Sequence, residues 1–93
     1  MKSIPVTQIC ANYNIPQSFI DDLYRYDLIE LIEIESVRHI SNSEIAQLER
    51  LMRMHYDLEI NFEGLDVINN LLQQIDDLQN ELTILRNRID FYE

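Results

Sequence analysis

The longest regular pattern in the chain lies in its last third, where apolar residues recur at alternating steps of three and four. This seam consists of eight positions: Ile68, Leu71, Ile75, Leu78, Leu82, Leu85, Ile89 and Tyr92. Such a heptad repeat predicts an α-helix with a narrow apolar stripe. A chain of 93 residues has little of its own to lay over the whole stripe. We therefore expect the seam to be a dimerisation surface covered by a helix of a second chain.

The same pattern predicts one helix over residues 62–91, about 45 Å long at 1.5 Å per residue. Asn61 is expected to cap its start, and Gly64 falls in the first turn, where the helix penalty of glycine is least. Position a is mostly β-branched and position d mostly leucine, which favours a parallel two-stranded coil. Leu72 widens the stripe, so the first turns are expected to pack on the rest of the chain as well. The alternative is a helix that folds back along its whole length onto the preceding helix.

Two short helices joined by a tight turn are predicted at the start of the chain. The first covers residues 4–12, with Thr7 as a plausible N-cap, and Asn14 breaks it. Pro16 fits the first turn of the second helix. One face of that second helix is apolar and is predicted to make its contacts: Phe19, Ile20, Leu23 and Tyr24.

A small β-hairpin and a third helix follow. Residues 31–35 alternate apolar and polar side chains in the period of a strand, and residues 37–40 are expected to return beside them after a turn near Ser36. Residues 41–43 provide cap-forming side chains, and apolar residues at helical spacing then predict a helix to about Leu58.

The charge of the chain argues against nucleic acid as a partner for the whole surface. The chain contains seventeen acidic and seven basic residues, which gives a formal net charge of −10. Both halves are acidic, so a basic surface on another protein is the better match. We expect a soluble, cytoplasmic protein, because the chain has a single cysteine, no recognisable signal peptide and no apolar stretch of membrane-spanning length.

No motif of an enzyme or a metal site is found. A single glycine leaves no glycine-rich phosphate loop. Cys10 as a nucleophile would need His39 or His55 beside it, and no spacing among these three residues is typical of a metal site. Asp76 and Asp77 are adjacent on a helix, so they point about 100° apart and are interpreted as solvated surface. We expect no catalysis, no cofactor and no metal.

The predicted fold is mainly α. Its elements follow the order of a winged helix-turn-helix unit with a dimerisation helix after it: helix, tight turn, helix, hairpin, helix and long helix. Four stretches resemble the MerR superfamily: residues 6–10, residues 14–17, the Leu28-Ile29 pair and residues 58–65. The resemblance implies a winged helix-turn-helix-like domain over residues 1–60 and a dimerisation helix over residues 61–93. MerR-like proteins dimerise through antiparallel coils, whereas the core residues favour a parallel one, so the direction stays open.

The whole chain is more similar to one branch of that superfamily, the chaperone-modulator (CbpM) family. The similarity lies in residues 38–40, in residues 58–68 and in residues 78–82 running into 85–89. It implies a homodimeric regulator that binds the J-domain of a DnaJ-like, CbpA-type co-chaperone. Such a regulator restrains both the stimulation of a DnaK-type chaperone and the DNA association of its target.

The predicted second helix can be tested against DNA binding, the usual function of the superfamily. Residues 14–35 hold six acids and one base, whereas a recognition helix needs cations and amides. We therefore predict a protein-binding surface made of Asp21, Asp22, Tyr24, Tyr26, Glu30, Glu33 and Glu35. Three alternatives are kept: Tyr24 in the core, acids that are only a solvated face, and a MerR-like DNA-binding transcriptional regulator.

Overall fold

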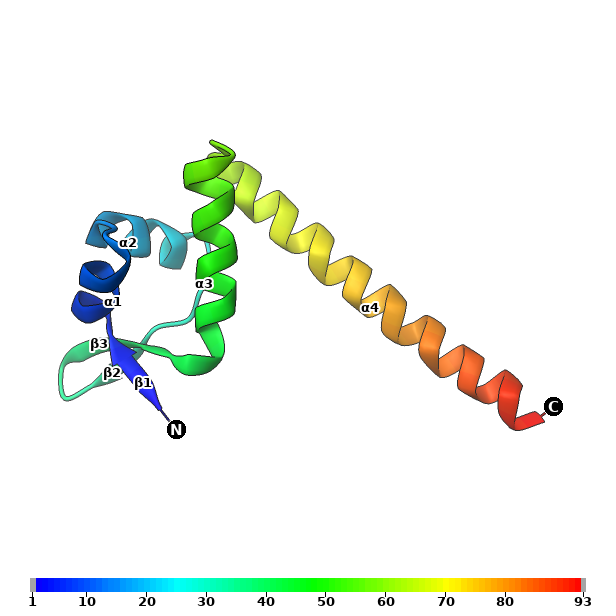
Figure 1. Cartoon of the computed structure of the whole chain (residues 1–93). Coiled ribbons are helices and arrows are strands. Elements are labelled where there is room, and N and C mark those ends of the chain that lie inside the picture. Colours follow the sequence, from blue (N-terminus) through cyan, green and yellow to red (C-terminus); the bar gives the residue numbers. More distant parts are fainter. Residues whose placement is uncertain (1, 93) are drawn as a thin grey trace.

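The computed structural model describes residues 2–92, and in it one long helix leaves a small body of helices and strands at an angle (Figure 1). The chain measures 55 × 32 × 20 Å along its principal axes. Its elements are β1 (Ser3–Pro5), α1 (Val6–Tyr13), α2 (Gln17–Arg25), β2 (Ile32–Ile34), β3 (Val37–Ser41), a 3-10 turn (Asn42–Glu44), α3 (Ile45–Met52), a π-helical turn (Arg53–Asp57) and α4 (Phe62–Tyr92). The predicted fold class, a mainly α winged helix-turn-helix with a long last helix, is confirmed.

The N-terminus differs from the prediction. Ser3–Pro5 forms β1, which pairs antiparallel with β3, and α1 begins only at Val6. Pro5 occupies the N-cap and no side chain caps the helix, so the assignment of Thr7 as the cap was wrong. Proline favours this position because its ring fixes φ and it has no N–H to leave unpaired. Asn14 ends α1 in the left-handed conformation, with φ 56°, as expected of a helix breaker.

The predicted hairpin is confirmed, and its turn is tight. Ile34 pairs directly with Val37, which leaves a two-residue loop. Glu35 and Ser36 both have positive φ, 51° and 66°. Positive φ at both central residues is typical of a type I′ turn, whose twist matches that of the flanking strands. The sheet has the order β1-β3-β2, so β3 is its central strand.

The third helix has the predicted extent but not a uniform geometry. After α3 it widens into the π turn, where the amide of Leu58 donates to the carbonyl of Arg53, five residues back. Glu59 then has φ 57° and reverses the chain. The Asn61 cap of α4 is confirmed, because its Oδ1 accepts from the Gly64 amide at 2.8 Å.

Steric crowding explains why residue 64 is glycine better than the small helix penalty of glycine in the first turn does. A Cβ built on this residue would lie 2.8 Å from Cγ2 of Ile60 and 3.1 Å from Oδ1 of Asn61. Any larger residue at position 64 would therefore force the Ile60 side chain to move and would crowd the capping Asn61 side chain.

The core lies between α1, α2, α3 and β3, with one residue from the start of α4. Its buried members are Val6, Ile9, Ile15, Phe19, Ile20, Leu23, Leu28, Ile29, Ile40, Leu48, Leu51 and Leu65. Leu65 is fully buried, so the first turns of α4 pack on the body as predicted, although Leu72, on which the prediction was based, is exposed.

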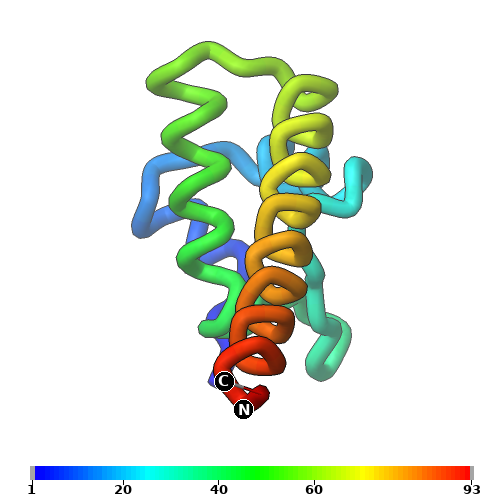
Figure 2. Tube along the Cα trace, turned by 90° about the vertical axis from the view of Figure 1, so that its right-hand side faces the viewer, coloured from blue at the N-terminus to red at the C-terminus, as the bar shows by residue number. Residues whose placement is uncertain are grey.

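Beyond its first turns, α4 projects away from the body, and residues 70–92 are all exposed. Figures 1 and 2, turned by 90° from each other, together show that α4 diverges from α3. The last side-chain link that we find between the two helices in the described residues is the hydrogen bond from Gln47 of α3 to Asn69, at 2.9 Å. The alternative of a helix folded back along α3 is therefore wrong. We call residues 70–92 the arm.

Candidate protein-interaction site

The outward face of α2 carries Gln17, Ser18, Asp21, Tyr24 and Arg25, all of them exposed. Phe19, Ile20 and Leu23 point into the core, as predicted. Tyr24 does not: it is 52% exposed, so the alternative that placed Tyr24 in the core is wrong. At 100° per residue Tyr24 stands about 140° round the helix from Phe19, at the edge of the apolar stripe.

Two ion pairs neutralise the arginines next to this face. Arg25 pairs with Asp22 one turn before it, and Nη1 of Arg38 on β3 lies 2.7 Å from Oδ1 of Asp21. Pairs as exposed as these add little to stability. They do lower the positive potential of this surface, because each of the two guanidinium groups has a carboxylate beside it.

Tyr26 lies apart from the outward face of α2. Its hydroxyl donates to Oε1 of Glu63 at 2.8 Å, and its ring stacks on Phe62 with the centroids 6.0 Å apart. The residue thus ties the end of α2 to the first turn of α4. A contact of Tyr26 with a partner stays a prediction.

This hydrogen bond shifts the titration of both groups. It is the main cause that lowers the pKa of Glu63, and it raises the pKa of Tyr26. The folded-state pKa of Glu63 lies below its ordinary value. The bond therefore stabilises the folded protein at pH values above that ordinary pKa. That contribution is lost as the pH falls through the lowered pKa.

We expect Tyr26→Phe to raise the pKa of Glu63 toward the ordinary range of a carboxyl group, because the donor is removed and the stacked ring is kept. An NMR titration of the Glu63 side-chain carboxyl checks this. Tyr13→Phe, which removes a hydroxyl elsewhere in the body, serves as the control and should leave that pKa unchanged. An unchanged titration in Tyr26→Phe would show that the bond is not formed in solution.

The remaining predicted acids lie along the hairpin and the loop before it, and all of them are exposed. Glu33 is the register partner of Arg38 in the strand pair, so it stands on the same face of the sheet as that arginine. Glu30 shares a shallow hollow with Tyr24. Glu35 stands at the tip of the turn. The structure thus brings the predicted acids together in two groups, on α2 and on the hairpin, and not as one cluster.

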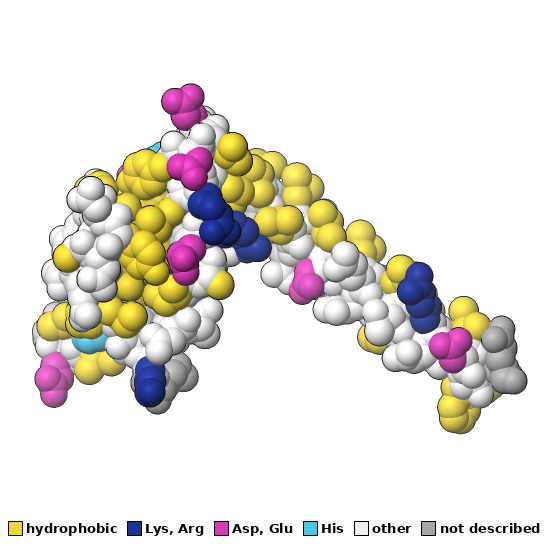
Figure 3. Space-filling view, viewed as in Figure 1, with side chains coloured by type: hydrophobic (Ala, Val, Ile, Leu, Met, Phe, Trp, Pro, Cys, Tyr) yellow, Lys and Arg dark blue, Asp and Glu magenta, His cyan; other side chains and the backbone are white. Residues whose placement is uncertain are grey.

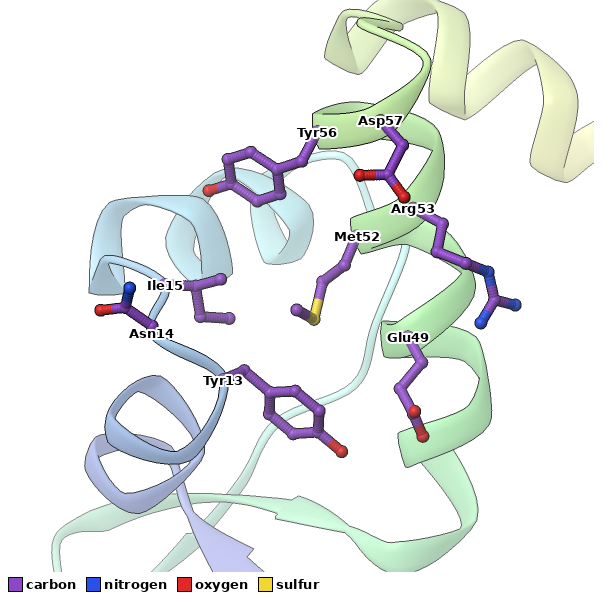
Figure 4. A pocket seen from close by; sticks show the side chains of 8 residues that line it. All are labelled: Tyr13, Asn14, Ile15, Glu49, Met52, Arg53, Tyr56 and Asp57. Atoms are coloured by element: carbon purple, nitrogen blue, oxygen red, sulfur yellow. The ribbon is translucent and has the colours of Figure 1, made fainter.

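Sequence reasoning missed a groove of about 340 Å³ between the α1–α2 turn and the third helix (Figure 4). It is lined by Tyr13, Asn14, Ile15, Glu49, Met52, Arg53, Tyr56 and Asp57. Burial is the largest of the causes that raise the pKa of Tyr56 there. No signal in the sequence marks this groove, because its walls are 34 or more residues apart in the chain.

A cluster of aromatic rings at the junction of body and arm was also missed. The His55 ring centroid lies 4.7 Å from that of Phe62 and 5.2 Å from that of Phe19. His55 Nδ1–H donates to the Ile60 carbonyl at 2.8 Å, so the ring is fixed in this position. Cys10 is not part of this aromatic cluster. Its thiol is half-buried in α1, and burial raises the pKa of the thiol.

The seam along the arm is open to solvent. From Leu71 to Ile89 its six members are each between 50% and 63% exposed, and only Ile68 at its start is half-buried. Figure 3 shows hydrophobic side chains following the arm as a continuous row. Apolar patches of this extent mark interaction surfaces, because leaving them in water is unfavourable.

One comparison with known proteins decides the family. The family model described as MerR HTH family regulatory protein matches residues 4–87, nearly the whole chain. The chain belongs to this MerR family. No curated protein and no solved structure gives a significant match. For this MerR-family chain, α2 is therefore the helix that stands in the position of a recognition helix, and the β2–β3 hairpin is its wing.

Two further observations concern residues 2–92. No helix in this part of the MerR-family chain combines the length and apolar character needed to cross a membrane. A group of three or more His, Cys, Asp or Glu side chains arranged to hold a metal ion is not found there.

Proposed function

We propose that this MerR-family protein is a chaperone modulator that binds and inhibits the J-domain of a DnaJ-like co-chaperone through its acidic surface. It acts by occlusion, as a homodimer joined through the arm, and catalyses no reaction. The choice of a J-domain comes from the resemblance to the CbpM branch of the superfamily.

The observation that carries the proposal is the state of the two arginines beside α2. Arg25 and Arg38 are both bound to carboxylates of α2, so the face that would meet DNA presents no free cation among the described residues. DNA binding gains free energy when lysines and arginines replace the counterions of phosphates. This face would instead bring carboxylates to the phosphates. A J-domain presents a basic helix to its chaperone, and that helix complements this surface.

The charge-reversed variant Asp21→Lys/Asp22→Lys tests the proposal. The host's own DnaJ-like J-domain is captured on the immobilised protein in rising salt. We expect the wild type to bind and the variant to bind at least about tenfold more weakly, because two attractive contacts become repulsive. Asp76→Lys/Asp77→Lys makes the same change of charge on the arm and should bind as the wild type does.

The second candidate is a DNA-binding transcriptional regulator, and the description of the matching family favours it. Fluorescence anisotropy with duplex DNA from the promoter of the gene separates the two functions. Specific retention of a duplex by the wild type at physiological salt, together with no capture of the J-domain, would replace our proposal with this one.

A further inference from the structure

The outer face of the small sheet is apolar and uncovered within the described residues. Alternate residues of a strand point to opposite faces. On β3, Ile40 is fully buried and Arg38 reaches α2, so both point inward. Val37 and His39 therefore point outward, and their partners in the strand pairing are Ile34 and Ile32.

These outward side chains form one contiguous patch. Ile32, Ile34 and Val37 are 36%, 43% and 46% exposed. His39 is half-buried beside them and its Nδ1–H donates to the Val37 carbonyl at 2.9 Å. Figure 3 shows hydrophobic side chains over the sheet at the lower left of the body. An antiparallel sheet with one solvated face normally carries polar residues there, so this patch is out of place on a free surface.

Acids border the patch at both ends of the hairpin. Glu35 stands at the tip, and Glu30 precedes β2 at its base. Glu44 follows β3 at the same base, where burial is the main cause that raises its pKa and the charge of Glu30 raises it further. Of the nearby cations, Arg38 points inward to Asp21, and Lys2 lies next to β1 at the opposite edge. The surface therefore suits a partner with apolar side chains between cations.

We propose that the outer face of the wing, built on Ile32, Ile34 and Val37, docks an amphipathic helix whose apolar stripe is bordered by lysine and arginine. The inference rests on the proposed function and assigns this face to the basic helix of the same J-domain. Acids at the ends of the hairpin then hold the cations of this helix, while the wing supplies the apolar contact. An added strand fits less well, because β2 is an edge of only three residues.

The double variant Ile34→Thr/Val37→Thr tests the wing. Threonine keeps the β-branched shape that suits a strand, and a hydroxyl replaces one methyl group of Val37 and the ethyl group of Ile34. We expect capture of the J-domain to weaken about tenfold or more, with an unchanged circular dichroism spectrum. Val67→Thr/Ile84→Thr makes the same exchanges at exposed positions of α4 and should bind as the wild type does.

The possible results separate this inference from the proposed function. If the wild type captures the J-domain and the wing variant captures it equally well, the wing is not the docking face and the proposed function stands. If the wild type captures no J-domain, the proposed function fails and the assignment of its helix to the wing fails with it. If the wing variant only loses self-association in light scattering, the occupant is a second copy and the inference is overturned.

Discussion

Leu78→Asp is expected to convert the protein from a dimer into a monomer. Leu78 is a d position in the middle of the seam and is 63% exposed in the single chain. In a two-helix coil, positions a and d are covered by the partner, so the substitution puts a carboxylate into each half of a closed apolar interface. Losing a leucine from such a site costs about 2–5 kcal/mol. With two sites in each dimer, we expect roughly a thousandfold weaker association or more.

Size-exclusion chromatography with light scattering measures this effect. The wild type should give twice the chain mass of 11.1 kDa and Leu78→Asp the single value. Helicity should fall as well, since the freed arm lacks the packing that stabilises a long amphipathic helix in water. Asn80→Asp adds the same charge at an exposed position outside the seam and should remain dimeric. A wild type of 11.1 kDa at every concentration would remove the dimer from the proposal.

The parts of the fold that sequence predicted well are those with a long period or a distinct cap. The heptad runs through seven turns of α4, and a pattern of that length has no competing interpretation. Asn61 caps α4 as expected, because its side chain stands three residues before a free amide. β1 was missed because three residues are too few to show alternation, and its pairing with β3 depends on residues about 35 positions away.

The arrangement of the candidate site was not predicted. Asp21 and Glu33 were assigned to one acidic surface, yet Asp21 is paired with Arg38 of β3, a link that exists only because the hairpin folds back against α2. Tyr26 was grouped with Tyr24 because the two are close in sequence, but they lie on different sides of the end of α2. Contacts of this kind come from packing between elements, which the sequence of one chain does not show.

The structure divides the protein into two surfaces with different chemistry. The body presents carboxylates on α2 and around the apolar wing, which suits a basic target. The arm presents a stripe of leucine and isoleucine, which suits a copy of itself. Between them, the aromatic cluster and the Tyr26–Glu63 hydrogen bond fix the angle at which α4 leaves the body. In the dimer that we propose, that junction would set where the two bodies stand relative to each other.

Phe62→Ala is expected to have a large effect on the stability of the body. The Phe62 ring centroid lies within 6.0 Å of those of His55, Phe19 and Tyr26, so three aromatic neighbours lose a partner. Removing a packed phenylalanine and its ring pairs costs about 3 kcal/mol, and a domain of this size has about 5–15 kcal/mol in all. The substitution should therefore remove a large share of the free energy of unfolding.

Urea unfolding followed by circular dichroism, at one fixed protein concentration, measures the loss. Phe91→Ala is the matched control: the same substitution at the tip of the arm, where the side chain is 82% exposed, should change the free energy of unfolding by less than about 0.5 kcal/mol. If the two variants unfold at the same urea concentration, the aromatic cluster does not hold the arm to the body. A selective loss in Phe62→Ala would instead mean that the cluster is the structural link between the partner-binding body and the arm. Binding of the J-domain through Asp21, Asp22 and the wing should then persist in any Phe62→Ala protein that remains folded, since these residues lie outside the cluster.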